Sequence, residues 1–419
     1  MIKNMRNQHY AMIQREQEAF INWDFKESDT KEFTHSLHTY PAMMIPQIAR
    51  RLIYLYGKEA KNILDPFMGS GTSLVEASLT PHIKKAYGFD LNPLAYLISK
   101  VKTTLIKTEL LEKELSLILN SKEYKELPKF KIIEFWFKPK VIEKLAILKT
   151  AINKIKNQDI RDFFLVAFSE TIRNASNTRN SEFKLYRMEK EKLETYNPDV
   201  FKKFEKIALK NIKGMQEYLK ARQKTITKAQ IGNSMLELPL NSGSVDLIIT
   251  SPPYGDSKTT VAYGQFSRLS LQWLEYEDII DLDNRLMGGK TTKELYVKIN
   301  SPTLKGIIKR IGDIDQKRAK EVLSFYEDFD KCVIQLDRVM AKNGNICFVV
   351  GNRTVKGINI PTDKIMLEMF KARGNYKHIT THERAIPNKR MPSLNSPSNK
   401  IGQKVKTMCN EFIFVLQKF

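Results

Sequence analysis

Cysteine and histidine are scarce in this chain of 419 residues. The three cysteines are far apart and form no CxxC pair: Cys332, Cys347 and Cys409. This spacing excludes a disulfide scaffold and a cysteine zinc site, and it is typical of a protein in a reducing cytoplasm. Two of the histidine pairs have a spacing that a metal site can use, His35 with His38 and His378 with His382. No obvious carboxylate or cysteine completes either pair, so we predict loop or core histidines and no metal site.

Long apolar runs are also missing. The longest, such as residues 163–168, are the length of a core segment and far below the roughly 20 residues that span a bilayer, so we predict no contact with membranes. The first residues, MIKNMRNQHYAM, contain no apolar stretch of the kind found in a secretion signal. We therefore expect a cytoplasmic protein.

Acidic residues are few relative to basic ones. The chain has 69 Lys and Arg against 47 Asp and Glu, a formal net charge of +22. Such an excess points to a polyanionic partner, and nucleic acid is the first candidate. The basic residues are concentrated in residues 202–228 and 384–406, whereas residues 62–100 are nearly balanced. This distribution predicts a surface that binds a phosphate backbone, with an affinity that falls steeply as salt is added.

A βαβ pattern begins near residue 45. Apolar residues at helical spacing predict a helix that ends at Gly57, followed by a strand at 62–65, a helix at 73–79 and a second strand at 86–90. Alternation of this kind is typical of a parallel sheet with helices on its faces.

Two segments interrupt the α/β pattern. Residues 101–230 are rich in lysine with a mostly helical pattern, and residues 256–322 are irregular and basic. Strands are predicted at 245–250, 346–350, 378–382 and 411–416. Ser324 and Glu327 form a capping-box signal for a helix that Asn343-Gly344 would stop. We interpret the whole as one open α/β sheet with two insertions.

The segment DPFMGSGT, residues 65–72, lies between a predicted strand and a predicted helix. Its glycines let a ligand approach the backbone, and the helix N-terminus offers free N–H groups. Asp90 ends the next strand, where an acidic side chain can hold ribose hydroxyls. The pattern indicates a nucleoside-containing cofactor, while the absence of GxxxxGK[ST] excludes a P-loop.

The segment Ser251-Pro252-Pro253-Tyr254 directly follows the apolar strand at 245–250. Two prolines fix the backbone and remove two N–H donors, which leaves carbonyl acceptors facing outward. An exocyclic amine on a base needs such acceptors, and Ser251 Oγ and the Pro252 carbonyl can supply them. Tyr254 offers a ring on which a base can stack.

Together DPFMGSGT and SPPY resemble the S-adenosylmethionine-dependent amino-methyltransferases of DNA, most closely the N4-cytosine type. The segments at 38–41, 88–93 and 231–234 resemble the family's methionine-side segment, ribose-binding strand end and adenine-binding turn; many members have aspartate in place of Asn233. The resemblance implies a Rossmann-like class I methyltransferase sheet, mostly parallel with the last strand antiparallel. It implies that S-adenosyl-L-methionine is bound by Tyr40, Pro41, Asp65, Pro66, Phe67, Gly69, Ser70, Gly71, Thr72, Asp90, Asn92, Asn233 and Ser234.

The implied reaction is direct methyl transfer to the amine of a flipped base, with no covalent enzyme intermediate and with Ser251, Pro252, Pro253 and Tyr254 as the catalytic segment. Serine at the first position is typical of N4-cytosine enzymes, whereas aspartate or asparagine dominates among N6-adenine enzymes. Methylation at cytosine C5 needs a cysteine nucleophile within a Pro-Cys pair, and no cysteine here follows a proline. An RNA base methyltransferase and a non-catalytic nucleic-acid-binding protein are the competing interpretations.

The resemblance divides the chain into an extension at 1–34, a catalytic domain at 35–100 and 228–419, a helical basic insertion at 101–227 and a second insertion at 256–322. Either insertion can recognise the target sequence, and Tyr263, Arg268 and Trp273 are expected near the target base. The candidate DNA contacts are Arg173, Arg179, Arg268, Lys389 and Arg390. Double-stranded DNA is the expected partner, together with a cognate restriction endonuclease, and DNA binding would associate the protein with the nucleoid. The sequence assigns no oligomeric state.

Overall fold

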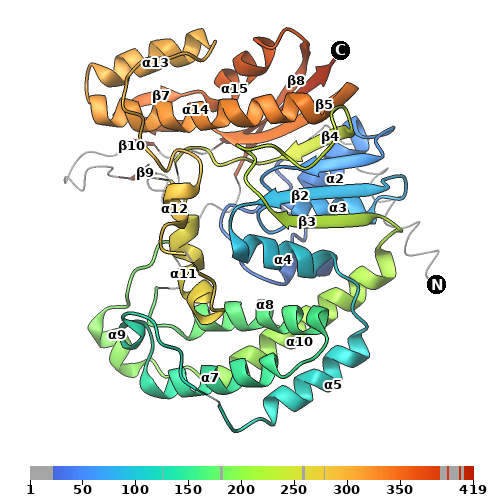
Figure 1. The fold of residues 1–419 in the computed structure, drawn as a ribbon, viewed down its shortest axis with the longest axis vertical. Helices are drawn as coiled ribbons and strands as arrows, with labels where there is room; N and C mark the ends of the chain where they lie inside the picture. Colours follow the sequence, from blue (N-terminus) through green and yellow to red (C-terminus); the bar gives the residue numbers. More distant parts are fainter. Residues whose placement is uncertain are drawn as a thin grey trace.

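The computed structural model describes residues 22–124, 126–179, 183–256, 260–277, 279–386, 394–395, 405–406 and 410–419. A seven-stranded sheet in the order β3-β2-β1-β4-β5-β11-β8 organises this part of the chain (Figure 1). Its strands are β1 Asn62–Asp65, β2 Lys85–Asp90, β3 Ile226–Ile231, β4 Val245–Thr250, β5 Met340–Gly351, β8 Tyr376–Ala385 and β11 Asn410–Lys418. Two small antiparallel pairs are formed by β6 Arg353–Val355 with β7 Ile358–Ile360, and by β9 Leu394–Asn395 with β10 Val405–Lys406.

All the neighbouring strands are parallel except β11, which runs antiparallel to β5 on one side and to β8 on the other. The mostly parallel sheet with an antiparallel last strand is therefore confirmed. From β1 the chain builds outward through β2 to β3, and it then returns to place β4 on the other side of β1. The sheet thus has a switch point at the carboxyl ends of β1 and β4, which is where open α/β sheets bind ligands.

Alternating side chains on the central strands serve the two faces of the sheet. On β1, Ile63 packs toward α2 (Pro46–Tyr56) and α3 (Thr72–Leu79), whereas Leu64 packs into the cluster that includes α14 (Gln316–Val339). On β4, Ile249 belongs to the first of these clusters and Ile248 to the second. Burial on both faces explains why adjacent residues in these strands, such as Ile63 and Leu64, are both apolar.

The remaining helices fall into two groups. α13 (Pro302–Gly312) and α15 (Thr362–Lys371) pack with α14 over one face of the sheet, and α4 (Pro93–Thr103) connects the sheet to a separate helical body (Figure 1). The helical body comprises η1 Phe33–Ser36, α5 Thr108–Leu119, α6 Ile133–Trp136, α7 Pro139–Asn153, α8 Gln158–Ala175, α9 Lys190–Thr195, α10 Val200–Ala221, α11 Tyr263–Trp273 and α12 Leu282–Arg285. In the described part of the chain, no helix combines the length and apolar character required to cross a membrane.

The first insertion shares one hydrophobic core with α11 and α12 of the second. Trp273, at the end of α11 in the second insertion, is buried with its ring centroid 5.7 Å from that of Phe137 and 6.0 Å from that of Phe168, both in the first. Ser270 Oγ also donates to the Ser169 carbonyl at 3.0 Å. The irregular structure expected for 256–322 is therefore wrong in part, because α11, α12 and α13 lie within it. Trp273 was expected near the target base, and the structure shows its indole buried in the helical core.

The predicted start and end of α14 differ from those observed. The helix begins at Gln316, eight residues before Ser324, and the Asp315 side chain caps it by accepting from the Arg318 N–H at 3.0 Å. Ser324 lies mid-helix, where its hydroxyl donates to the Lys320 carbonyl at 2.9 Å. At the other end the helix stops at Val339, and Asn343-Gly344 lies inside β5 with Asn343 at a φ of 62°. Serine and Asn-Gly bond locally in several settings, so their sequence signal does not fix a helix end.

Candidate functional site

A pocket lies at the carboxyl ends of β1, β2 and β4, the position set by the strand order. Its volume is about 870 Å³, including the solvent at its open mouth. Of the thirteen residues expected to bind the cofactor, all except Gly71 line it. These twelve are Tyr40, Pro41, Asp65, Pro66, Phe67, Gly69, Ser70, Thr72, Asp90, Asn92, Asn233 and Ser234. Ser251 and Pro253 of the SPPY segment line the same pocket, so two motifs almost 180 residues apart in sequence meet there.

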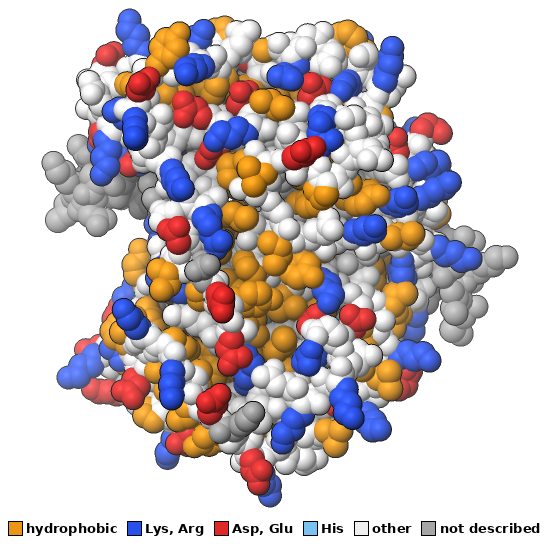
Figure 2. Space-filling model, in the orientation of Figure 1, with side chains coloured by type: hydrophobic (Ala, Val, Ile, Leu, Met, Phe, Trp, Pro, Cys, Tyr) orange, Lys and Arg blue, Asp and Glu red, His pale blue; other side chains and the backbone are white. Residues whose placement is uncertain are grey.

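Several apolar side chains complete the wall and were not identified from the sequence. They are Met43, Met44, Leu91, Met235, Leu286 and Met287. Figure 2 shows hydrophobic side chains gathered in the hollowed middle of one face of the molecule, with Lys and Arg spread around them. Isolated methionines and leucines in loops carry no sequence signal that separates them from core residues, which is why they were missed.

The Asp65 carboxylate shapes the glycine loop from within. One carboxylate oxygen accepts from the Phe67 N–H at 3.1 Å and from Thr250 Oγ1 at 2.7 Å, and the other accepts from the Ser73 hydroxyl. Burial raises the pKa of Asp65 to about 6, although these hydrogen bonds oppose the rise. Asp65 therefore ties the loop to β4 and α3, which fixes the course of the backbone around the pocket.

Gly71 is the N-cap residue of α3 and has a φ of +79°, a conformation that favours glycine. A Cβ at this position would lie 2.8 Å from Ser99 Oγ and 2.9 Å from Ser99 Cβ. The loop thus needs glycine both for its backbone angle and for the close approach of α4.

We expect Gly71→Ala to lower the free energy of unfolding by about 1–3 kcal/mol, because it adds left-handed strain and a clash with Ser99. Chemical denaturation measures this loss. Gly243→Ala is the matched control, since Gly243 also has a positive φ of +64° but no neighbouring atom within 4 Å of the position that a Cβ would take. Equal losses in the two variants would show that packing against α4 adds nothing.

Asp90 and Asn92 connect the second strand end to the pocket. Asp90 Oδ2 accepts from the Gly69 N–H at 3.0 Å and Oδ1 accepts from the Asn92 N–H at 2.9 Å, while burial raises the pKa of Asp90 to about 6. The Asn92 side-chain amide donates to Tyr40 OH at 3.0 Å and to Ser267 Oγ at 2.7 Å. This single amide therefore joins the segment before α2, the second strand end and α11.

The pocket wall also includes α11 directly. Tyr263, its first residue, stacks on Tyr40 with ring centroids 5.9 Å apart and an interplanar angle of 27°. Tyr263 was expected near the target base, and it lines the pocket. The helical body thus supplies one side of the site.

The turn after β3 is held by local hydrogen bonds. Asn233 Oδ1 accepts from the Met235 N–H at 3.0 Å, and Ser234 Oγ donates to the Pro66 carbonyl at 2.6 Å. By contrast, Ser70 Oγ is buried in the pocket wall with no hydrogen-bond partner among the described residues. An unpaired buried hydroxyl at a ligand-sized pocket is a group available to a bound molecule.

The SPPY segment is anchored to the last strand of the sheet. Ser251 Oγ lies 3.1 Å from Tyr254 OH, and Tyr254 OH donates to Glu411 Oε1 at 2.9 Å. Burial, followed by the charge of Glu411, raises the pKa of Tyr254 well above its usual value. Pro252 and Tyr254 do not line the pocket itself. Glu411, at the start of β11, was not identified from the sequence because nothing local links it to a motif 157 residues away.

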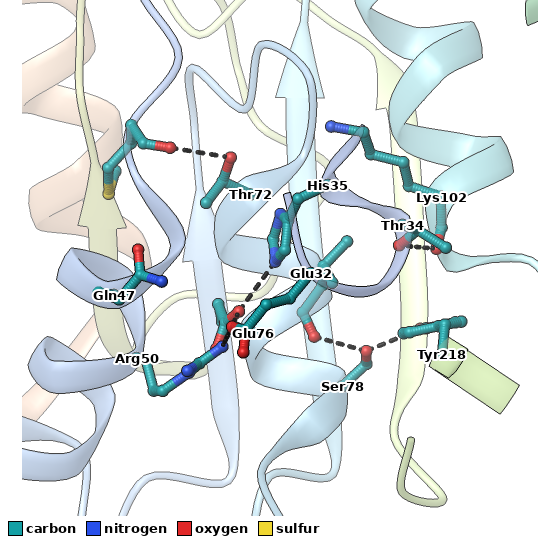
Figure 3. Close-up of polar contacts among 12 residues, drawn as sticks. Glu32, Thr34, His35, Gln47, Arg50, Thr72, Glu76, Ser78, Lys102 and Tyr218 are labelled. Carbon is teal, nitrogen blue, oxygen red and sulfur yellow. Dashed lines mark hydrogen bonds and ion pairs between the residues drawn. The ribbon is translucent and has the colours of Figure 1, made fainter. Parts of the chain in front are cut away.

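A buried polar cluster holds the segment that precedes the pocket (Figure 3). Glu76 of α3 accepts from Arg50 Nε at 2.8 Å and lies 2.8 Å from His35 Nε2, and Arg50 also donates to Glu32 at 2.9 Å. Burial alone would raise the pKa of Glu76, but Arg50 and His35 lower it to about 2. The cluster fixes η1 against α2 and α3, a few residues before Tyr40 enters the pocket.

The candidate DNA contacts lie in different environments. Arg173 is buried, with its guanidinium 4.2 Å from the centre of the Phe266 ring, so its side chain is not presented on the surface as a DNA contact requires. Arg179 is exposed and forms an ion pair with Glu189 at 3.1 Å, and Arg268 is half-buried on α11. Lys389 and Arg390 lie outside the described residues.

The basic residues of segment 384–406 were expected to form part of a surface that binds a phosphate backbone. Arg384 departs from this expectation because it is buried, donates to the Trp23 carbonyl at 2.9 Å and pairs with Glu411. Its partner is in register with it on the neighbouring strand β11, a pairing that only the folded sheet reveals.

Comparison with known proteins bears on this site. Residues 2–100 match the N6/N4 methyltransferase family model, described as DNA methylase. The chain is 46% identical over 427 residues to the type II methyltransferase M.MvaI of Kocuria varians, an alignment that covers 94% of this chain and 93% of that protein. It is 32% identical over 110 residues to the type II methyltransferase M.MjaII of Methanocaldococcus jannaschii, covering 25% of this chain and 20% of that one. A solved rRNA methyltransferase, aviRa from Streptomyces viridochromogenes, aligns over 95% of this chain and 94% of its own at 10% identity, with a TM-score of 0.33.

Proposed function

Because the chain belongs to the N6/N4 family of type II DNA methyltransferases, which use S-adenosylmethionine, we propose that it methylates the N4 amine of cytosine at a specific site in duplex DNA. The observation that carries the choice of cytosine is Ser251, which stands at the first position of SPPY and lines the pocket. Adenine N6 is the alternative target. A cognate endonuclease in a restriction system is part of the same proposal.

The pocket residues fit S-adenosylmethionine. The glycine loop lets a ligand approach the backbone, Ser70 Oγ is unpaired there, and apolar walls surround the polar strand ends. We assign the methionine side to Tyr40 and Pro41, the ribose to Asp90, and the adenine to the turn at Asn233 and Ser234. When bound, the cofactor supplies an electrophilic methyl group on sulfur.

The chain's own groups orient the amine that receives this methyl group. Ser251 Oγ and the Pro252 carbonyl accept hydrogen bonds from the two N–H groups of the amine, and the Tyr254 ring stacks on the extruded base. No nucleophilic side chain is needed for transfer to an amine. Burial raises the pKa of the Cys332 and Cys347 thiols well above the usual value, which leaves neither as a thiolate and supports amine rather than C5 methylation.

We assign DNA recognition to the helical body as a whole. The insertion at 101–227 shares one core around Trp273 with α11 and α12 of the second insertion, so these parts present their surfaces as a unit, whereas α13 packs over the sheet. α10 carries exposed lysines suited to phosphates, among them Lys202, Lys206, Lys213 and Lys220.

Nucleoside analysis after incubation with labelled S-adenosylmethionine tests the proposal. Label in N4-methylcytosine from DNA supports it, and N6-methyladenine moves the target to the alternative base. Label confined to RNA contradicts the DNA assignment. Cofactor binding without label in any substrate contradicts the enzymatic assignment altogether.

We expect Tyr254→Ala to reduce the rate of methyl transfer at least tenfold while cofactor affinity changes less than twofold, because loss of stacking removes about 1–3 kcal/mol from base binding. Single-turnover kinetics and calorimetry measure the two quantities. Tyr54→Ala on α2 is the control, since Tyr54 lies away from the pocket lining and its ring contacts Lys58. A comparable loss of cofactor affinity in Tyr254→Ala would place the base pocket elsewhere.

A further inference from the structure

Three oxygen-bearing side chains form a continuous hydrogen-bonded chain beside the pocket. Ser251 Oγ, which belongs to a pocket-lining residue, lies 3.1 Å from Tyr254 OH, and Tyr254 OH lies 2.9 Å from Glu411 Oε1. Arg384 Nη1 donates to the other carboxylate oxygen of Glu411, and Arg384 Nε donates to the Trp23 carbonyl at 2.9 Å. The Arg384 side chain is 6% exposed and that of Glu411 16%, so the far end of the chain is shielded from water.

The chemistry of these groups fixes which oxygen donates and which accepts in each hydrogen bond. An ionised carboxylate only accepts hydrogen bonds, so the one proton of the Tyr254 hydroxyl is donated to Glu411. Tyr254 oxygen can then only accept from Ser251, and the one proton of the Ser251 hydroxyl is used in that bond. The remaining lone pairs of Ser251 Oγ accept hydrogen bonds and cannot donate them.

We propose that Glu411 is the positioning residue that makes Ser251 Oγ an acceptor and thereby selects a target base that carries an exocyclic amine over the same base carrying a carbonyl. The inference rests on the proposed function of the Ser251 site, and it holds for cytosine or adenine as the target. Arg384 supports the selection because it donates to the other carboxylate oxygen of Glu411 and so holds that side chain in place. Glu411 touches no substrate in this scheme and acts through the Tyr254 hydroxyl.

Replacing Glu411 with glutamine tests the direction of the hydrogen bonds from Ser251 through Tyr254 to Glu411. Glutamine keeps the shape but adds an N–H₂ donor, so the Tyr254 and Ser251 hydroxyls can reverse and Ser251 can donate into the pocket. The probes are two duplexes with the site at which the wild-type protein methylates DNA, one with the native target base and one with its carbonyl counterpart, uracil for cytosine or hypoxanthine for adenine. We expect the ratio of the two equilibrium affinities to fall about tenfold or more in Glu411→Gln.

Two further variants separate this role from a structural one. Tyr254→Phe keeps the ring but removes the hydroxyl that links Ser251 to Glu411, so it should lower the same affinity ratio. The double variant with Glu411→Gln should lower the ratio no further. Glu383→Gln, the same change on the neighbouring strand β8, contacts Asn410 and should leave the ratio unchanged. Cofactor affinity and the unfolding midpoint are measured for every variant.

The outcomes are distinct. An unchanged ratio in both Glu411→Gln and Tyr254→Phe overturns the inference while the methyltransferase assignment stands, because wild-type methylation has already located the site. If Glu411→Gln does not fold, the ratio in Tyr254→Phe decides alone. Absence of wild-type methylation instead overturns the proposed function, and this inference with it.

Discussion

Replacing Arg50 with methionine should lower the free energy of unfolding by about 3–5 kcal/mol, because it leaves the buried Glu76 carboxylate without its main cation. The Glu76 and Arg50 side chains are 1% and 3% exposed, so water cannot solvate the charge that remains. Urea denaturation at neutral pH measures the change. In the wild type, Arg50 and His35 lower the pKa of Glu76 from 4.5 to about 2, so its stabilising contribution is complete above about pH 4.5 and is lost as pH falls toward 2.

Arg51→Met is the matched control for this variant. Arg51 follows Arg50 on α2 but lies partly in solvent, 4.2 Å from the centre of the Phe25 ring and with Nη1 donating to the Asn22 carbonyl at 2.6 Å. Its loss should cost about 1 kcal/mol. If Arg50→Met costs no more than Arg51→Met, the buried cluster is not a source of stability.

Replacing Lys102 with methionine should stabilise the protein, in contrast to Arg50→Met. We expect it to raise the free energy of unfolding at pH 7 by about 2–4 kcal/mol. Lys102 lies near the end of α4, fully buried, and its Nζ has no hydrogen-bond partner among the described residues (Figure 3). Burial, followed by the charge of Lys210, lowers its pKa from 10.5 to about 7. Methionine has a similar shape without the cost of an unpaired buried amine.

The pH dependence of the Lys102 effect identifies its cause. The unfolded chain binds a proton at Lys102 below about pH 10.5 and the folded chain only below about pH 7, so wild-type stability rises with pH across this interval. The gain in Lys102→Met should therefore be full at pH 7 and vanish near pH 10.5. Lys100→Met is the control on the same helix, because Lys100 is paired with Asp162 at 2.6 Å and its removal should cost about 1 kcal/mol. A loss of stability in Lys102→Met at pH 7 would show that the amine has a partner in solution.

The elements that the sequence predicted well are those with strong local patterns. Strands at 62–65 and 245–250 are confirmed, and the neighbouring apolar residues in each, Ile63-Leu64 and Leu247-Ile248-Ile249, are buried on both faces of the sheet. Gly57 ends α2 as predicted, and its N–H donates to the Ile53 carbonyl at the end of the helix. The start of α14 was missed because Asp315 and Ser324 are both acceptable caps, and only packing against the sheet decides between them.

The candidate site divides in the same way. The glycine loop and the SPPY segment each carry a local motif, and the strand order brings Asp65 and Ser251 to one pocket. The burial of Arg173 could not be predicted because the sequence around it is polar, and the Phe266 ring that covers its guanidinium comes from a distant part of the chain. Glu411 and Arg384 depend on cross-strand register, which no local pattern contains.

The shared core around Trp273 limits how this protein can be rebuilt. Residues 101–227 and 256–322 lie on opposite sides of β3 and β4 in the sequence, yet Phe137 and Phe168 from one pack against Trp273 from the other. A chimera that imports only one of the two segments from a relative would place foreign side chains against this indole. A chimera built on this protein therefore has to keep residues 101–227 together with α11, whose Tyr263 stacks on Tyr40 in the pocket wall.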